Sequence, residues 1–414
     1  MTAIDTPTST PAQTVGRPLA TVLGLLTIFG PISMDLYLPV LPALTAELQS
    51  TTSVAQLTIT ACLLGLAIGQ LIAGPLSDRF GRRTPLLIGV IAYTVTSALC
   101  ALSPTVETLI AARFVQGLAG AVGIVIAQAA GRDVYSGGKL LRYYGRLTVL
   151  GGVAAIIGPV IGGQLATVTD WRGVFLFLAA VGVAILGASL VIFRETLPAN
   201  RRTTGGLSHT LSDFRRLLAD RVFVGAVLIT GFTYAAIFAY LSGATYILQG
   251  VYGLSPQGYS FAFGLNSLGF VIFGFIGGRL SERWSERGTL AVGLVMTVSG
   301  ALGLLATALL HLPLIAIILS LFTMVSGVAV TSPPATSLAL KDYPDIAGTA
   351  SSLLGLARFA FGGLAAPLVG IGGASDPVPF GIVAAVAAGA AALSLGLVRR
   401  QHGKANPNTT VKEK

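Results

Sequence analysis

Long apolar runs recur along almost the whole chain and constrain its fold more than any other feature. Twelve runs of about 20 residues, the length that crosses a bilayer as a helix, are separated by short polar connections. Of the 414 residues, 53% are hydrophobic and only 10% are charged, whereas soluble domains carry about 25% charged residues. In lipid, a helix satisfies its own backbone hydrogen bonds. The sequence therefore predicts an all-α integral membrane protein.

The longest polar connection, 194–220, divides the runs into two sets of six. We expect an N-terminal tail at 1–17, a six-helix bundle at 18–193, a cytoplasmic linker at 194–220, a second bundle at 221–398 and a tail at 399–414. The expected spans are 18–41, 53–75, 85–103, 107–131, 145–167, 173–193, 221–248, 257–279, 289–309, 313–337, 347–371 and 377–398.

Basic residues gather on one side of the expected spans. Apart from Arg113 and Arg358 well inside spans and Arg172 on the far side, every Lys and Arg falls in the same set of connections, at the span ends that adjoin them, or in the tails. Positive residues favour the cytoplasmic face, so both termini are expected in the cytoplasm. The formal net charge of +10 then reflects topology and not nucleic-acid binding. Cys62 and Cys100 lie inside spans, so neither a disulfide framework nor a metal site is expected.

The two halves also share a loop sequence. "GPLSDRFGRR" (74–83) follows the second span and "GRLSERWSER" (278–287) follows the eighth, with Gly, Leu, Ser, an acid, Arg and an aromatic in register. Such a repeat is typical of secondary transporters built from two similar halves. The second copy carries Ser285 and Glu286 in the places of Gly81 and Arg82, so we do not expect it to do the same work.

These features resemble the major facilitator superfamily and, within it, the Bcr/CflA drug-resistance exporters. The general resemblance is carried by the loop at 74–83, by "RFVQG" (113–117) on the fourth span and by the antiporter-like "GPVIGG" (158–163) on the fifth. The subfamily resemblance is carried by "MDLYLPVLP" (34–42), "RETLP" (194–198) and "AGTASSLLGLARF" (347–359). The resemblance implies a major facilitator fold of twelve transmembrane helices in two pseudo-symmetric bundles, working by alternating access in the bacterial inner membrane.

The resemblance further implies a conformational latch on the cytoplasmic side. In the family, the acid of this loop caps the start of the eleventh span, and an arginine pairs with an acid that ends the fourth. Here those contacts would join Asp78 to 346–348 and Arg82 to Asp133, and an anion at a helix start gains about 0.3–1 kcal/mol. The latch would favour the outward-open state; the alternative is a topology anchor only. Its expected members are Gly74, Asp78, Arg79, Gly81, Arg82 and Asp133.

The fifth span carries a second motif that affects packing. Pro159 removes a backbone hydrogen bond and bends the helix, while the glycines beside it allow a neighbouring helix to approach closely. The family resemblance implies that this packing seals the pathway against proton leak; ordinary helix packing is the alternative. The motif consists of Gly158, Pro159, Gly162 and Gly163.

Three charges lie well inside the expected spans, away from the span ends: Asp35, Arg113 and Arg358. From a rise of about 1.5 Å per residue, all three lie at a similar depth, roughly 8 Å below the outer surface for the first two. Burial favours a protonated carboxyl and a neighbouring guanidinium favours the charged form, so an Asp35 that meets Arg113 in only one conformation would couple proton binding to that conformation. A static pair is the alternative. Gln116 and Asn266 are further polar candidates for the cavity.

Aromatic side chains near these charges are candidates for substrate contact, although in membrane helices such residues more often pack or mark the interface. The candidates are Tyr37, Tyr234, Phe238, Tyr240, Tyr246 and Phe261. They suit moderately polar, ring-containing solutes such as bicyclomycin- or chloramphenicol-type antibiotics.

The expected function is therefore proton-coupled efflux of small drug-like molecules by a monomer. The proton gradient would supply the energy without a cofactor, since the nucleotide-binding pattern GxxxxGK[ST] is absent. The main alternative is a proton-coupled importer of a small metabolite on the same fold, which the antiporter-like segment disfavours. An integral-membrane enzyme and a passive channel are further alternatives. An enzyme would need clustered acids, His or Cys, which the sequence does not show.

Overall fold

The computed structural model describes residues 17–135, 137–202, 207–343, 346–373 and 375–398, and the helices within those ranges are joined by turns and loops without a β-strand. The N-terminal half contains α1 (Arg17–Asp35), η1 (Leu38–Val40), α2 (Leu41–Glu47), α3 (Thr52–Phe80), α4 (Arg83–Ala101), α5 (Val106–Val134), α6 (Gly137–Val168) and α7 (Trp171–Ile192). The connection contains η2 (Ala199–Arg201) and α8 (Leu207–Leu218). The C-terminal half contains α9 (Arg221–Tyr246), η3 (Ile247–Val251), α10 (Pro256–Arg283), α11 (Glu286–Leu310), α12 (Leu314–Leu340), α13 (Ala347–Ala365), η4 (Ala366–Gly370) and α14 (Val378–Val398).

The expected all-helical membrane fold is confirmed. Among the described residues, ten helices are long and apolar enough to cross a membrane, and an eleventh span arises if Leu19–Gly30 and Ile32–Glu47, which meet at an angle of 44°, are taken as one bent crossing. α6 is 32 residues long, more than the roughly 20 residues that a crossing requires. Together these elements give each half six helical crossings, as the sequence predicts.

Polar side chains fix where many of these helices begin. Each accepts a hydrogen bond from a backbone N–H of the first turn, which otherwise has no partner within the helix. The caps are Thr51 for α3, Thr105 for α5, Asp170 for α7, Asp220 for α9, Ser255 for α10 and Ser285 for α11. α4 differs from these helices, because Arg82 stands at its N-cap position without a side-chain cap of its own.

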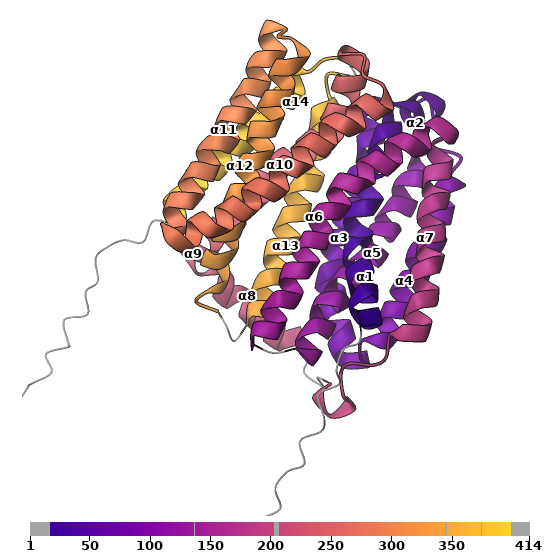
Figure 1. Cartoon of the computed structure of the whole chain (residues 1–414), viewed down its shortest axis with the longest axis vertical. Helices are drawn as coiled ribbons and strands as arrows, with labels where there is room; N and C mark the ends of the chain where they lie inside the picture. The colour runs from indigo at the N-terminus through magenta and orange to yellow at the C-terminus, as the bar shows by residue number, and fades with distance from the viewer. Residues whose placement is uncertain (1–16, 136, 203–206, 344–345, 374, 399–414) are drawn as a thin grey trace, which may run out of the picture.

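The two halves lie side by side (Figure 1). α6 packs along α10, and α3 packs along α13, so these four helices form the interface between the halves. One end of the bundle carries the loop that follows α3, together with α8 and its two arginines, Arg215 and Arg216. We name this the basic end and the other the outer end.

At the outer end the two halves are joined by hydrogen bonds. The Tyr246 hydroxyl pairs with Thr45 at 2.6 Å, and the Gln249 amide donates to the Pro39 carbonyl at 3.1 Å. Gln56 donates to the Ser242 carbonyl at 3.1 Å, and Ser53 donates to the Pro367 carbonyl at 3.0 Å. These bonds lie in the parts of α1 to α3 and α9 to η4 that are farthest from the basic end, so the conformation is closed at the outer end.

Candidate functional site

Asp35 is the last residue of α1, at the point where the first crossing breaks. Its side chain is 5% exposed, so the carboxyl lies inside the protein. It packs against Gly158 of α6, where a Cβ would lie 3.0 Å from the Cβ of Asp35. Pro39 follows in η1, and because proline has no N–H, it prevents the helix from continuing in register. The break therefore places an acid at the junction of α1 and α6.

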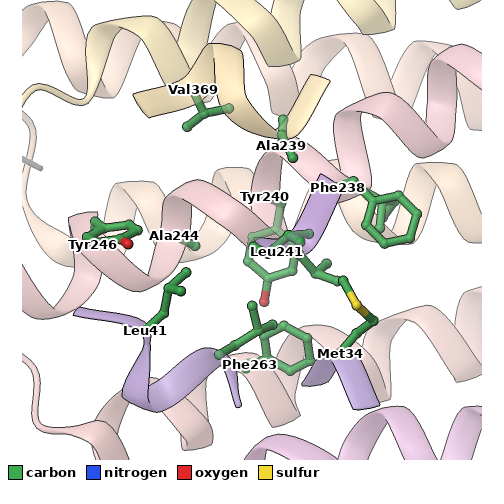
Figure 2. Close-up of a cluster of buried hydrophobic side chains, with 14 of the residues drawn as sticks. Met34, Leu41, Phe238, Ala239, Tyr240, Leu241, Ala244, Tyr246, Phe263 and Val369 are labelled. Carbon is green, nitrogen blue, oxygen red and sulfur yellow. The ribbon is translucent and has the colours of Figure 1, made fainter. Parts of the chain in front are cut away.

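The carboxyl of Asp35 lies within electrostatic range of the C-terminal half. It interacts electrostatically with Tyr240 of α9 and Tyr259 of α10. The Tyr240 hydroxyl accepts a hydrogen bond from the Asn266 amide at 3.0 Å, and its ring stacks on Phe263 at a centroid distance of 5.4 Å. Figure 2 shows Tyr240 and Phe263 of this half beside Met34 and Leu41 of the other half. The acid thus lies opposite a polar, aromatic face across the interface.

The expected pair between Asp35 and Arg113 is not formed in this conformation. Arg113 is fully buried and donates to the Ser33 carbonyl at 3.1 Å and to the Gln116 amide oxygen at 2.6 Å. Its guanidinium lies 4.6 Å from the ring centroid of Tyr37 and 5.5 Å from that of Phe175. The two residues lie at a similar level along the bundle, since Arg113 contacts Ser33 and Met34 just before Asp35. Arg113, on α5, binds the Ser33 carbonyl and Gln116, however, and its guanidinium does not pair with the Asp35 carboxyl.

Arg358 occupies a separate site on α13. It is half-buried, and its guanidinium lies 4.4 Å from the ring centroid of Tyr234 on α9. Phe238, one turn along α9, lies 6.4 Å from Tyr234 and 6.2 Å from Phe359 of α13, measured between centroids. These four residues form a compact group of one cation and three aromatic rings within the C-terminal half.

The remaining aromatic candidates lie in different surroundings. Tyr37 is buried and bonds to Thr58 at 2.7 Å, and Tyr246 belongs to the closed outer end described above. The assignment of Phe261 to the substrate site is wrong. Its side chain is 78% exposed and lies on the same face of α10 as the exposed Leu265, Leu268 and Ile272, which is the lipid-facing stripe of that helix.

Sequence reasoning missed Tyr259. It is fully buried, and its ring centroid lies 5.9 Å from that of Phe263. Tyr259, Phe263 and Asn266 are spaced by four and three residues, the spacing that places side chains on one face of a helix. This pattern on α10 was the available signal.

The loop between α3 and α4 forms a compact ion-pair network. Arg82 is buried and donates to Asp133 at 2.9 Å, to Ser77 at 2.7 Å and to Asp78 at 2.5 Å. The side chain of Asp78 is 44% exposed and faces Arg82 within its own half. Its expected contact with 346–348 falls partly on side chains outside the described set and stays a prediction.

The other expected latch residues have distinct surroundings. Gly81 adopts a positive φ of 87°, which favours glycine. Arg79 lies over the ring of Phe80, with 5.4 Å between its guanidinium and the ring centroid. Gly74 has open space where a Cβ would stand, so it is not required for a close approach.

The glycines of α6 contact both halves. A Cβ at Gly162 would overlap the carbonyl oxygen of Leu36, and one at Gly163 would overlap the hydroxyl of Ser260 on α10. With Gly158 against Asp35, these residues form a continuous line of close approach along α6, and Pro159 lies inside the helix. The motif therefore packs α6 against α1 on one side and α10 on the other.

The fold and the site together define a class. The protein has two similar bundles of membrane-crossing helices. A buried acid lies near the interface between them, and a cation with three aromatic rings lies within the second bundle. These are the features of a secondary transporter.

Comparisons with known proteins agree with this class. Residues 23–367 match the Major Facilitator Superfamily, and the chain belongs to that family. It is a transporter and not an enzyme. It is 36% identical over 93% of its length to an uncharacterized MFS-type transporter, YdgK, of Bacillus subtilis, covering 96% of that protein. It is 30% identical to a bicyclomycin resistance protein homolog of Haemophilus influenzae, covering 84% of this chain and 87% of the relative. Among solved structures, a mutant of the nucleoside transporter NupG superposes with a TM-score of 0.74 at 13% identity, over 92% of this chain and all of that one.

Proposed function

We propose that the protein is a drug/proton antiporter of the bacterial inner membrane that exports small drug-like molecules. The basic end is cytoplasmic, as the distribution of Lys and Arg predicts. The observation that carries the proposal is the buried Asp35 at the break in α1, packed against Gly158 of α6. A charge in a membrane helix costs roughly 2.5–3.5 kcal/mol at the centre and marks a transport pathway in most proteins. The drug-resistance name of a relative over most of both chains supports export of a drug.

Proton coupling follows from the position of the acid. With the outer end closed, Asp35 is enclosed by Gly158 of α6 and by the face of Tyr240 and Tyr259. When the halves separate at the outer end, this enclosure opens and water reaches the carboxyl, which changes its affinity for a proton. A proton taken up outside and released inside moves down the membrane potential, and each one supplies about 2.3 kcal/mol per 100 mV. No direct pairing with Arg113 is needed for this change.

The substrate site is the group formed by Arg358, Tyr234, Phe238 and Phe359. Three rings and one half-buried guanidinium offer an apolar, polarisable surface with a single strong hydrogen-bond donor. Such a surface suits a neutral or weakly acidic ring-containing solute. Bicyclomycin- and chloramphenicol-type antibiotics have this chemistry and are the probes to use first.

The test compares the intact protein with Asp35→Asn in a host that lacks its own exporters. Asparagine keeps the size of the side chain but cannot exchange a proton near neutral pH. We expect the intact protein to raise the inhibitory concentration of the drug several-fold and Asp35→Asn to abolish this resistance. Asp376→Asn, which removes an acid beyond η4, is the matched control and should retain resistance. All proteins must be present in the membrane in equal amounts.

Direction is tested in everted vesicles, whose cytoplasmic face is outside. An antiporter accumulates drug inside such vesicles when the lumen is acidified, and drug addition dissipates the pH gradient. Drug-dependent alkalinisation of the lumen supports the proposal. Accumulation that is independent of the gradient, or full resistance in Asp35→Asn, would overturn proton antiport. Uptake only in right-side-out vesicles would indicate an importer.

A further inference from the structure

The segment after α7 makes a contact that the transport cycle described above does not use. Glu195, in the "RETLP" segment, accepts a hydrogen bond from the backbone N–H of Arg82 at 2.7 Å and from that of Arg83 at 3.2 Å. These two N–H groups belong to the start of α4. The carboxylate thus reaches across 113 residues of sequence to cap a helix that has no cap of its own.

Comparison of the two loop copies shows why α4 needs this cap. In the second copy, Ser285 caps α11 by accepting from the N–H of Gly288 at 2.9 Å. The corresponding position in the first copy is Gly81, which has no side chain and adopts a positive φ. A Cβ at Gly81 would overlap the Glu195 carboxylate. Glycine therefore both removes the local cap and leaves room for the distant one.

Glu195 is held firmly in this role. Its carboxylate also accepts from the N–H of Leu197 at 3.0 Å, and Arg202 of the connection lies 3.7 Å from it. Partial burial disfavours the charged form, but the three backbone N–H groups and the Arg202 guanidinium outweigh this and hold the pKa of Glu195 below its usual range. The side chain is thus ionised at cytoplasmic pH, and a helix start favours an anion.

The next residue supports the same loop from a second direction. The Thr196 hydroxyl donates to Asp133 at 3.0 Å, on the same carboxylate oxygen that accepts from Arg82. Glu195 therefore orients the backbone of Arg82, and Thr196 orients the acid that binds its side chain. On the loop of the second half, Glu286 instead binds Ser337 and Lys341. Ser337 corresponds to Asp133 in the repeat. The acid of the contact therefore lies at the end of α5 in the first half, but on the loop in the second half.

We propose that Glu195 and Thr196 are positioning residues that hold the loop at 78–83 in the geometry required to close the cytoplasmic side. They act through Arg82 and do not touch the transported solute. Because Glu195 also binds Leu197 and Arg202, the same contact fixes the beginning of the linker to the N-terminal half. The proposal concerns the conformational cycle of the family and holds whichever solute is carried.

The test measures how far apart the cytoplasmic ends of the two halves are. Spin labels on Arg132→Cys and Asp342→Cys, at the ends of α5 and α12, report the ratio of cytoplasm-open to cytoplasm-closed molecules by pulsed distance measurement. We expect Glu195→Ala to raise this ratio by up to about fivefold, the factor that corresponds to roughly 1 kcal/mol for a helix cap if the whole of it favours the cytoplasm-closed state. Ser285→Ala is the matched control, because it removes the cap of α11 without affecting the loop at 78–83, and should leave the ratio unchanged.

A second comparison separates positioning from general destabilisation. If Glu195 acts through Arg82, adding Glu195→Ala to Arg82→Ala changes the ratio no further, whereas independent effects multiply. Should Glu195→Ala fail to fold, Glu195→Gln keeps one acceptor without the charge, and we expect a shift of about twofold. An unchanged ratio in the folded variants, or independent effects in the double variant, would overturn the proposal. Neither drug nor proton gradient is needed, so the result does not depend on drug/proton antiport.

Discussion

At the scale of single residues, Asp35 and Arg113 show what sequence determines about a buried charge. The rise of a helix gives the relative level of two residues on neighbouring helices, and Arg113 does contact Ser33 and Met34, just before Asp35. The direction of a side chain around the helix axis is harder to obtain, because α1 ends at Asp35 and the chain then turns through η1. A small change of phase at such a break directs Asp35 toward α6 and α9 instead of Arg113. The presence of a buried acid at this level was therefore predictable, but its neighbours were not.

The pKa of Glu195 leads to a prediction about pH. Its folded-state pKa is lower than the ordinary value of about 4.3. The stabilisation that comes from the charged form is thus fully present above that ordinary value and is lost only as the pH falls through the depressed one. We expect the difference between Glu195→Ala and the unchanged protein in the spin-label ratio to be constant from about pH 6 to about pH 8. A difference that halves within this interval would mean that another group, titrating near neutrality, controls the loop.

At the scale of elements, the glycines of α6 set how closely three helices approach. Gly162 is the sharpest case, since its missing side chain lies against the Leu36 carbonyl. Gly162→Ala forces α6 away from the break in α1, and overpacking of this kind costs about 1–3 kcal/mol. We expect a lower melting temperature in detergent and faster collapse of an imposed proton gradient in vesicles. Gly187→Ala on α7, where a Cβ would meet open space, is the control. Equal melting and equal leak in the two variants would contradict a sealing role for the motif.

The loop at 74–83 shows which contacts between elements can be anticipated. The expected partners Arg82 and Asp133 are in contact. Both lie at helix ends, and the short connections between helices place these two ends on the same side of the bundle. Glu195 could not be identified as the cap of α4 from local spacing, since a distant residue can replace a missing cap anywhere on the surface. The second loop has Ser285 as a helix cap where the first has Gly81. This difference between the repeats was the one indication that α4 takes its cap from a distant residue.

At the scale of the whole molecule, the hydrogen bonds at the outer end cross between the two halves, whereas the ion-pair network at the basic end does not. The hydrogen bonds at the outer end, among them Thr45 to Tyr246 and Pro39 to Gln249, cross between the halves. The network of Arg82 with Asp133 and Thr196 remains within the N-terminal half. Alternating access requires that contacts at one end weaken as those at the other form. The outer hydrogen bonds therefore stabilise the conformation observed here against the outward-open one.

Removal of one hydrogen bond at the outer end should shift the equilibrium between the outer-closed and outward-open conformations by a predictable amount. Tyr246→Phe keeps the buried ring but loses the bond to Thr45, and a net hydrogen bond contributes about 0.5–1.5 kcal/mol. We expect the outward-open fraction to rise by a factor of roughly 2–10, seen as a longer distance between labels at the outer ends of the two halves. Tyr252→Phe is the matched control, because the Tyr252 hydroxyl bonds to the Leu312 carbonyl within one half. An equal shift in both variants would mean that lost stability, and not a contact across the interface, had opened the outer end.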